Sequence, residues 1–346
     1  MSLQLKIINP LEYAQWDDLV ISTQDYTFFH SSSWARVLCE SYSYKPCYFI
    51  SLDEGKLSVL MAGMDIKSIL TGRRWVSIPF SDYCETIING DEHFQDGVIN
   101  HIIHYGKEIG WKSIEWRGGD LPQSVAHSSY YYGHTLELCH NEEQLFSTFR
   151  RYTKSAIKKA ISSGVEVQIT NSEESVKEFY RLHCITRKRH GVPPQPYFFF
   201  RKIYEHIISK NAGFVVLGSF QRKIIAGAVY FHFGEKAYYK YSASDPDYRH
   251  LNANRLAMWE AIKWYNQNNY KSMCLGRTEV ENEGLRRYKT GWGTKERIIK
   301  YYRYDLTKNT FVADVGPRAA SYKRIFQKTP IPFLRLVGLI VYRHMG

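Results

Sequence analysis

Residues 214–242, FVVLGSFQRKIIAGAVYFHFGEKAYYKYS, carry the clearest fold signal in the chain. Two runs rich in β-branched and aromatic residues, 214–220 and 224–233, flank the dipeptide Gln221-Arg222, a pattern typical of a β-hairpin. A third run of the same kind, 237–242, follows after a short polar break. The stretch therefore predicts a β-hairpin extended by a third strand.

Helices and strands surround this hairpin in an order that the first half of the chain repeats. Apolar residues at helical spacing predict helices, and short apolar or aromatic runs between turn signals predict strands. In the second half these are helices 172–190, 198–208, 254–266 and 283–288, and strands 272–275 and 297–306. In the first half they are helices 31–42 and 94–109, and strands 45–52, 57–66, 75–80, 111–116 and 130–139. The repeat predicts a duplicated α/β fold of α+β type, with mixed sheets covered by helices.

The charge is divided unevenly along the chain. The net charge of +12 combines −9 over residues 1–147 with +21 over residues 148–346. This asymmetry indicates two modules, of which the second meets an anionic partner. A phosphorylated small substrate, a nucleic acid backbone and an anionic membrane surface all remain open as that partner.

Composition excludes several protein classes. A length of 346 residues favours two domains, and 44% hydrophobic with 15% aromatic residues excludes a mainly disordered chain. No apolar run reaches the length of about 18 residues that spans a membrane. The first residues, MSLQLKIINPLEYAQWDD, lack the features of a secretory signal, so we expect a cytoplasmic protein. The six cysteines form no CxxC pair, so we expect no metal site.

Basic residues gather in the second half at two places. Residues 149–161, FRRYTKSAIKKAI, predict a helix that contacts phosphates or simply presents a solvated basic face. Residues 187–194, RKRHGVPP, join a basic helix end to a rigid Pro-Pro turn, and here the cations either bind an anion or stabilise the helix dipole. The cations of the first group are Arg150, Arg151, Lys154 and Lys158.

Two further residues lie where site residues are common. Arg277 is expected just past the carboxyl end of a strand, the usual location of site residues in α/β layers. Lys289 is expected at a helix end beside Gly291 and Gly293, where the backbone can approach a ligand closely. A purely structural role for Lys289 is the alternative.

Seven stretches resemble the FemAB-type aminoacyltransferases, a group that includes BioF2-like acetyltransferase-domain proteins. They are FFHSSSWARVL (28–38), IPFSDY (78–83), YTKSAIKKAISSGVEV (152–167), TRKRHGVPPQP (186–196), YKYSASDPDYRHLNANRLAMWEAIKW (239–264), LGRT (275–278) and EGLRRYKTGWGTKERIIKYYRY (283–304). The resemblance implies two tandem GNAT-like domains, 1–147 and 148–306, with the first completed by residues 307–346. It also implies transfer of an aminoacyl group from aminoacyl-tRNA to an amine of an anionic cell-wall or sugar precursor, without a further cofactor.

The resemblance also assigns site residues. The family carries an EGL-x-x-F-K stretch with a catalytic lysine, which corresponds to Lys289, while Tyr288 replaces the phenylalanine. The basic residues with which the family holds precursor phosphates have no clear counterpart in this sequence, and Arg187 and Arg277 are our own candidates for that role. The GNAT pyrophosphate loop, Q/R-x-x-G-x-G/A, is not visible. Its place is taken by DPDYRHLNANR (245–255), where Arg249 and Asn254 are candidates for substrate binding at a helix start.

The expected chemistry is attack of an amine on an activated ester or thioester carbonyl. Such a reaction needs alignment of two substrates and stabilisation of the developing oxyanion, which we assign to Lys289. An N-acyltransferase that uses acyl-CoA and a non-catalytic module that binds RNA or membrane remain as alternatives. The missing pyrophosphate loop favours aminoacyl-tRNA over acyl-CoA.

The tail, residues 317–346, contains no Asp or Glu. Its apolar run, 331–342, is too short to span a membrane. We expect either a helix that packs back on the protein or an interfacial helix in 330–346 that touches the inner face of an anionic membrane.

Overall fold

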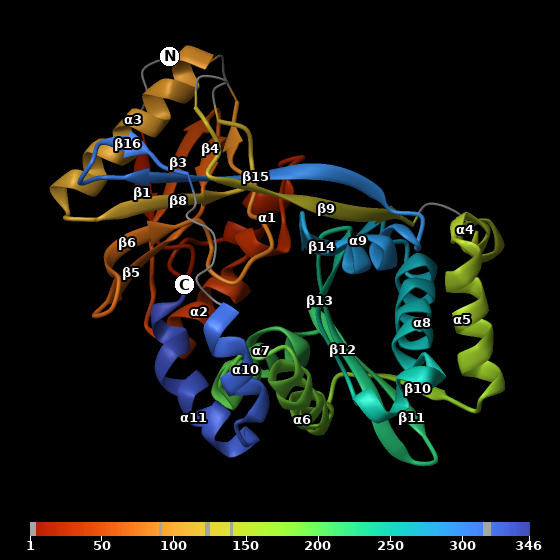
Figure 1. Cartoon of the computed structure of the whole chain (residues 1–346). Coiled ribbons are helices and arrows are strands. Elements are labelled where there is room, and N and C mark those ends of the chain that lie inside the picture. Colours follow the sequence, from red (N-terminus) through yellow and green to blue (C-terminus); the bar gives the residue numbers. More distant parts are fainter. Residues whose placement is uncertain (1–4, 90–91, 122–124, 139–140, 314–319) are drawn as a thin grey trace. The chain divides into compact units, whose positions relative to one another are not determined.

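The computed structural model describes residues 5–89, 92–121, 125–138, 141–313 and 320–346 (Figure 1). The chain forms two compact units. Unit 1 comprises Met1–Tyr131, Ile298–Gly316 and Tyr342–Gly346, and unit 2 comprises Tyr132–Arg297 and Pro317–Val341. The predicted boundaries lay after residues 147 and 306. The two units instead divide inside strands β9 (Ser129–Glu137) and β15 (Lys295–Asp305).

The sheet of unit 2 is built around the predicted hairpin. Its strands follow the order β10 (Glu166–Thr170), β11 (Gly213–Phe220), β12 (Lys223–Phe233), β13 (Lys236–Ser244), β14 (Ser272–Glu279) and β9. Strands β10 to β13 are antiparallel neighbours, whereas β13 and β14 run parallel. Gln221 and Arg222 join β11 to β12 with φ of 49° and 65°. Positive φ at both positions matches the right-handed twist of the strands, which confirms the predicted hairpin.

Helices cover both faces of this sheet. On one face α5 (Arg151–Ser162) and α8 (Ala253–Gln267) lie side by side (Figure 1). Phe214, Val216 and Tyr230 belong to the apolar cluster that these helices complete. Because successive strand residues point to opposite faces, the other face meets α6 (Glu173–Arg189) and α7 (Tyr197–His206). The remaining elements between residues 141 and 290 are α4 (Glu142–Thr148), η2 (Ile208–Lys210), η3 (Pro246–Leu251) and α9 (Glu283–Thr290).

Unit 1 contains two sheets. One follows the order β1 (Lys6–Ile8), β3 (Tyr48–Asp53), β4 (Lys56–Met61) and β7 (Ile87–Ile88). The other follows β15, β8 (Ser113–Arg117), β6 (Gly72–Val76), β5 (Met64–Ser68) and β2 (Lys45–Pro46), and β16 (Thr310–Phe311) pairs with β15. Its helices are α1 (Trp16–Ile21), η1 (Phe28–His30), α2 (Ser32–Tyr42), α3 (Glu92–Glu108) and η4 (Tyr342–His344).

Two predicted strands of unit 1 are wrong in their bounds. The run 57–66 forms β4 and β5 in different sheets, and the chain breaks between them at Gly63. A Cβ at Gly63 would lie 2.1 Å from the Trp75 indole, so the close approach of Trp75 requires glycine. The run 75–80 ends as a strand at Val76, because Ile78 and Phe80 adopt φ of 33° and 60°.

The tail is divided between the units. Helices α10 (Ala320–Lys328) and α11 (Ile331–Val341) pack against α6 in unit 2. In unit 1, the Tyr44 hydroxyl donates to the Tyr342 carbonyl at 3.2 Å, and the Gly346 amide donates to that hydroxyl at 3.1 Å. Residues 307–346 therefore do not all join the first unit as expected. Within the described residues, every helix is too short or too polar to cross a bilayer.

The contact between α11 and the Pro193-Pro194 turn that follows α6 depends on Gly338. A Cβ at this position would lie 2.0 Å from the Pro194 carbonyl oxygen. We therefore expect Gly338→Ala to loosen α11 and to lower stability by about 1–3 kcal/mol. Hydrogen exchange of the α11 amides and urea unfolding measure the two effects. The control is Gly284→Ala, whose Cβ would meet only Asn282 Oδ1 at 3.9 Å. Unchanged α11 exchange in Gly338→Ala would contradict the contact.

Candidate functional site

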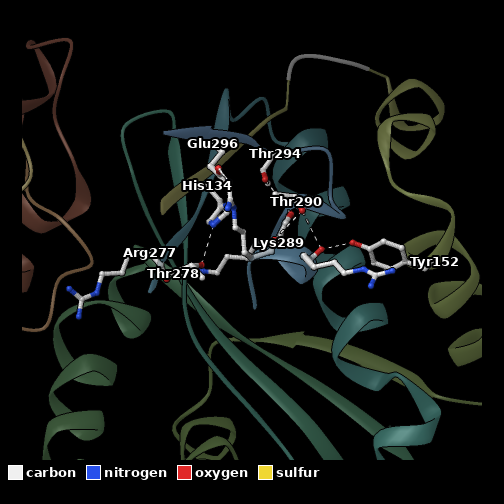
Figure 2. A network of polar contacts seen from close by, with 10 residues as sticks. His134, Tyr152, Arg277, Thr278, Lys289, Thr290, Thr294 and Glu296 are labelled. Atoms are coloured by element: carbon white, nitrogen blue, oxygen red, sulfur yellow. Dashed lines mark hydrogen bonds and ion pairs between the residues drawn. The ribbon is translucent and has the colours of Figure 1, made fainter. Parts of the chain in front are cut away.

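A buried ammonium group lies at the centre of the candidate site. Lys289, in the last turn of α9, is 4% exposed, and its Nζ donates to the Arg277 carbonyl at 2.7 Å (Figure 2). The local fold fixes this lysine. The Asn282 side chain caps the start of α9 by accepting from the Leu285 amide, and the Thr294 hydroxyl donates to the Lys289 carbonyl at 3.2 Å. Taking an ammonium group out of water costs free energy, so a buried lysine is expected to have a polar partner or a function.

The Arg277 carbonyl lies in the part of β14 that continues past the residues paired with β13. Strands β13 and β14 pair over residues 236–238 and 272–274 only, although both continue toward their carboxyl ends. Gly276, with φ of 72°, interrupts the regular strand just before Arg277. The carboxyl ends of parallel strands are a common location of ligand sites in α/β sheets. Lys289 is therefore held at such an end.

His134 lies beside this lysine on β9 (Figure 2). Its Nε2 is 3.1 Å from Thr278 Oγ1, and its Nδ1 is 3.9 Å from Glu296 Oε2. Burial, together with the positive charge of Lys289, lowers the pKa of His134 to about 4, against the opposing effect of Glu296. His134 is therefore neutral at pH 7, and Lys289 has no second cation at this position.

An ion pair fastens the start of β15 to α9. Arg286 binds both carboxylate oxygens of Glu296 at 2.6 and 2.8 Å, and its guanidinium lies 3.8 Å from the ring centre of Tyr132. The hydrogen bond from Arg286 lowers the pKa of Glu296. Bidentate pairing of this kind fixes orientation as well as charge. It positions the carboxylate that faces His134.

Aromatic side chains and Arg255 support α9 from the other side. Arg255 lies 4.8 Å from the ring centre of Tyr288 and 5.4 Å from that of Tyr152, and it donates to Thr153 Oγ1 at 3.2 Å. The Tyr152 hydroxyl donates to the Arg287 carbonyl. Burial raises the pKa of Tyr288, which packs against the core cluster. The sequence analysis did not single out His134, which lies in no motif, and in the stretch 245–255 it chose Arg249 and Asn254 and passed over Arg255.

The prediction for Gly291 and Gly293 is wrong. A Cβ at Gly291 would lie 2.3 Å from the Tyr152 hydroxyl, and one at Gly293 would lie 2.7 Å from Thr148 Oγ1. The space left by the missing side chains of these glycines is therefore taken up by Tyr152 and Thr148 of the protein itself. Arg277 also departs from its expected place, since it lies within β14 and not past its end.

The other predicted binding residues lie elsewhere in unit 2. Arg187 is half-buried and donates from Nε to the Pro193 carbonyl at 3.3 Å. Arg249 is exposed in η3, and Asn254 is half-buried in the first turn of α8. Burial, followed by the charges of Arg189, Arg187 and Arg249, lowers the pKa of His190. Arg187 and Arg249 thus both act on the charge of His190.

Helix α5 carries the predicted anion-binding group. Arg150 is its N-cap residue and is exposed, as are Arg151 and Lys158. Lys154 donates to the Ser147 carbonyl at 2.9 Å and so ties α5 to α4. Lys159 is exposed as well, and of the exposed cations Arg151 and Lys158, seven residues apart, lie on one face of the helix.

Comparison with known proteins shows that the residues of this site belong to a recognised domain. Residues 147–290 match the family model of the acetyltransferase (GNAT) domain. The matched range begins before α5 and ends with α9, so it includes both Lys289 and the Arg277 carbonyl.

Two curated relatives are transferases by name. The UDP-N-acetylmuramoylpentapeptide-lysine N(6)-alanyltransferase of Weissella viridescens is 26% identical over 130 residues, which cover 38% of each chain. The lipid II:glycine glycyltransferase of Staphylococcus haemolyticus (strain JCSC1435) is 22% identical, over 53% of this chain and 61% of that protein. The chain therefore matches less than two thirds of either relative.

Solved structures share the fold. FemX superposes with a TM-score of 0.66 at 14% identity, over 86% of this chain and 97% of that one. A tandem GNAT protein from the clavulanic acid biosynthesis pathway gives 0.55 at 7% identity, over 88% and 99%. The comparisons confirm the resemblance to FemAB-type GNAT-like proteins and the predicted α/β fold of two tandem GNAT-like domains.

The lowered pKa of His134 predicts an acid-sensitive stability. The unfolded chain takes up this proton near pH 6.5 and the folded chain near pH 4, so stability falls as the pH drops between them. We expect this group to contribute on the order of 3 kcal/mol to that loss. His134→Asn should flatten the dependence of the unfolding free energy on pH over this range.

The matched control for this titration is His104→Asn. His104 is exposed and pairs with Glu108 at 3.2 Å on α3. This variant shows how much the loss of an exposed imidazole changes the curve, and the effect of His134→Asn is compared with it. If His134→Asn retained the full wild-type dependence, His134 would not be buried in its neutral form.

Proposed function

We propose that this protein is an acyltransferase that moves an aminoacyl group from aminoacyl-tRNA onto an amine of a cell-wall precursor. The names of the two curated relatives support an aminoacyl donor and an acceptor of this class. The match of residues 147–290 to the GNAT domain supports acyl transfer. The observation that carries the proposal is the buried ammonium of Lys289 at the carboxyl ends of β13 and β14.

The reaction is a direct transfer. The neutral amine nitrogen attacks the ester carbonyl carbon, a C–N bond forms, and the carbonyl oxygen becomes an oxyanion. The C–O bond to the ribose then breaks, and the proton lost by the amine is taken up by the ribose oxygen. Lys289 stabilises the oxyanion, because a fixed ammonium in a dry site acts without reorganisation during the reaction. In the free protein Lys289 Nζ donates to the Arg277 carbonyl at 2.7 Å.

The neutral state of His134 supports this role. A neutral imidazole adds no positive charge beside the ammonium of Lys289. His134 is thus a positioning residue, held by Thr278 at 3.1 Å.

Substitution of Lys289 tests the proposal. We expect Lys289→Met to lower kcat by roughly 10²–10³, with a smaller change in KM, because the interaction acts in the transition state. Lys289→Arg should retain part of the activity, since it keeps a cation. Thermal unfolding and circular dichroism verify that each variant is folded.

The control is Lys295→Met, which removes an exposed lysine that pairs with Glu137 at 2.5 Å. It should leave kcat close to wild type. A folded Lys289→Met protein with near wild-type turnover would exclude Lys289 as the oxyanion-stabilising group.

The donor is assigned to the basic face of α5. Arg151 and Lys158 are exposed seven residues apart, so they project from one side of the helix. We expect Arg151→Ala/Lys158→Ala to raise KM for aminoacyl-tRNA and to reduce the slope of log affinity against log salt by about 1–2. The matched control removes two exposed lysines of unit 1, Lys56 and Lys308. Equal effects of both pairs would show a general charge effect and would contradict an α5 site.

An acyl-CoA-dependent N-acyltransferase is the second candidate, because the matched domain model is that of an acetyltransferase. Turnover with acyl-CoA and none with aminoacyl-tRNA would establish this alternative. Salt-dependent RNA binding without turnover of either donor would instead indicate a non-catalytic module.

A further inference from the structure

Helix α11 exposes a continuous apolar face. Phe333, Leu336 and Ile340 follow the spacing i, i+3, i+7, and Leu339 lies beside them, all more than half exposed. The opposite side of the helix is buried against unit 2 through Leu334 and Gly338. One face of α11 is thus packed against the rest of unit 2, and its second face is apolar and exposed.

Helix α10 extends this surface with further apolar residues and adds cations. Tyr322 and Ile325 are more than half exposed and lie three residues apart. Lys323, Arg324 and Lys328 are exposed on the same helix. Residues 317–346 contain no acidic residue, so nothing in the tail neutralises these charges.

The end of α6 adds a cluster of positive charge next to α10. Gln327 of α10 donates to the Arg189 carbonyl at 3.0 Å, and the backbone of Lys323 touches Gly191 so closely that a Cβ there would lie 2.5 Å away. Arg189 Nε and Nη1 are buried and have no hydrogen-bond partner. Burial, followed by the charge of Arg249, lowers the pKa of Arg189. Like charges held together in this way favour binding of an anion.

One turn of unit 1 also exposes apolar side chains. Ile69, at the turn between β5 and β6, is 96% exposed, and Leu70 beside it is also exposed. Ser68 Oγ lies 3.1 Å from His344 Nδ1, so this turn contacts the last residues of the chain. Met345 is exposed there, and Arg343 adds a cation.

We infer that α10 and α11 form a docking surface for an anionic phospholipid bilayer. Exposed apolar side chains at helical spacing enter the boundary between headgroups and acyl chains, while lysines and arginines on the flanks contact lipid phosphates. Aromatic residues such as Tyr322 and Phe333 suit this boundary. The helices lie on the membrane and do not cross it, since α11 extends only over Ile331–Val341.

Charge complementarity favours a membrane over a protein partner. A segment that exposes apolar side chains and carries basic but no acidic residues matches the acyl chains and the anionic headgroups together. This inference goes beyond the proposed transferase activity and does not depend on Lys289. A membrane-bound state would bring the site to acceptors that are themselves carried by lipids.

Vesicle flotation with the full chain tests the inference. We expect binding to vesicles of phosphatidylcholine with phosphatidylglycerol, and weaker binding to phosphatidylcholine alone. Leu336→Asp/Ile340→Asp should reduce binding to the anionic vesicles by roughly ten-fold or more, as should the charge reversal Lys323→Glu/Lys328→Glu. All four residues are exposed, so both variants should fold.

The matched control is Ile161→Asp/Ile298→Asp, which changes two equally exposed isoleucines outside the tail and should bind as wild type does. Turnover of a water-soluble acceptor should be unchanged in all tail variants, which separates membrane docking from the transferase activity. Equal binding of wild type and both tail variants would overturn the inference. So would a wild-type dimer in light scattering that Leu336→Asp/Ile340→Asp converts to a monomer without any vesicle binding.

Discussion

The hydrogen bond between the Lys289 ammonium and the Arg277 carbonyl is the interaction on which the site depends. It places a charge in a nearly water-free position at 4% exposure, and it does so at the point where β13 and β14 have stopped pairing. An ammonium binds a charged oxygen more strongly than it binds a neutral peptide carbonyl. An oxyanion that forms during acyl transfer is such a charged oxygen.

The surroundings of this lysine fix its orientation and the charges next to it. His134 is neutral because burial and the nearby ammonium lower its pKa, and Glu296 is bound on both oxygens by Arg286. Arg255 lies between two tyrosine rings and fixes α9 against α5 and α8. The site is therefore built from contacts between α9, β9, β14 and β15, all of which carry residues of unit 2. The chemistry that we propose for it is positioning and charge, without a nucleophile from the protein.

Local patterns predicted most of the elements, and long-range contacts explain what they missed. The hairpin at Gln221 followed from two apolar runs around a short polar turn, and Lys289 was expected at a helix end. The carbonyl that receives its hydrogen bond was not predictable, because the approach of α9 to β14 depends on tertiary packing. The environment of Gly291 also depends on tertiary packing. A ligand was expected close to its backbone, but the Tyr152 hydroxyl lies there. The single run 57–66 was divided by Gly63 because an indole from another strand lies against it.

The most direct measurement is a crystal structure of the protein with a phosphonate analogue of the tetrahedral intermediate between aminoacyl ester and amine. The account predicts that a phosphonyl oxygen lies about 2.6–3.2 Å from Lys289 Nζ, at the carboxyl ends of β13 and β14. A complex in which Nζ binds only the Arg277 carbonyl, with the analogue bound at another place, would contradict it.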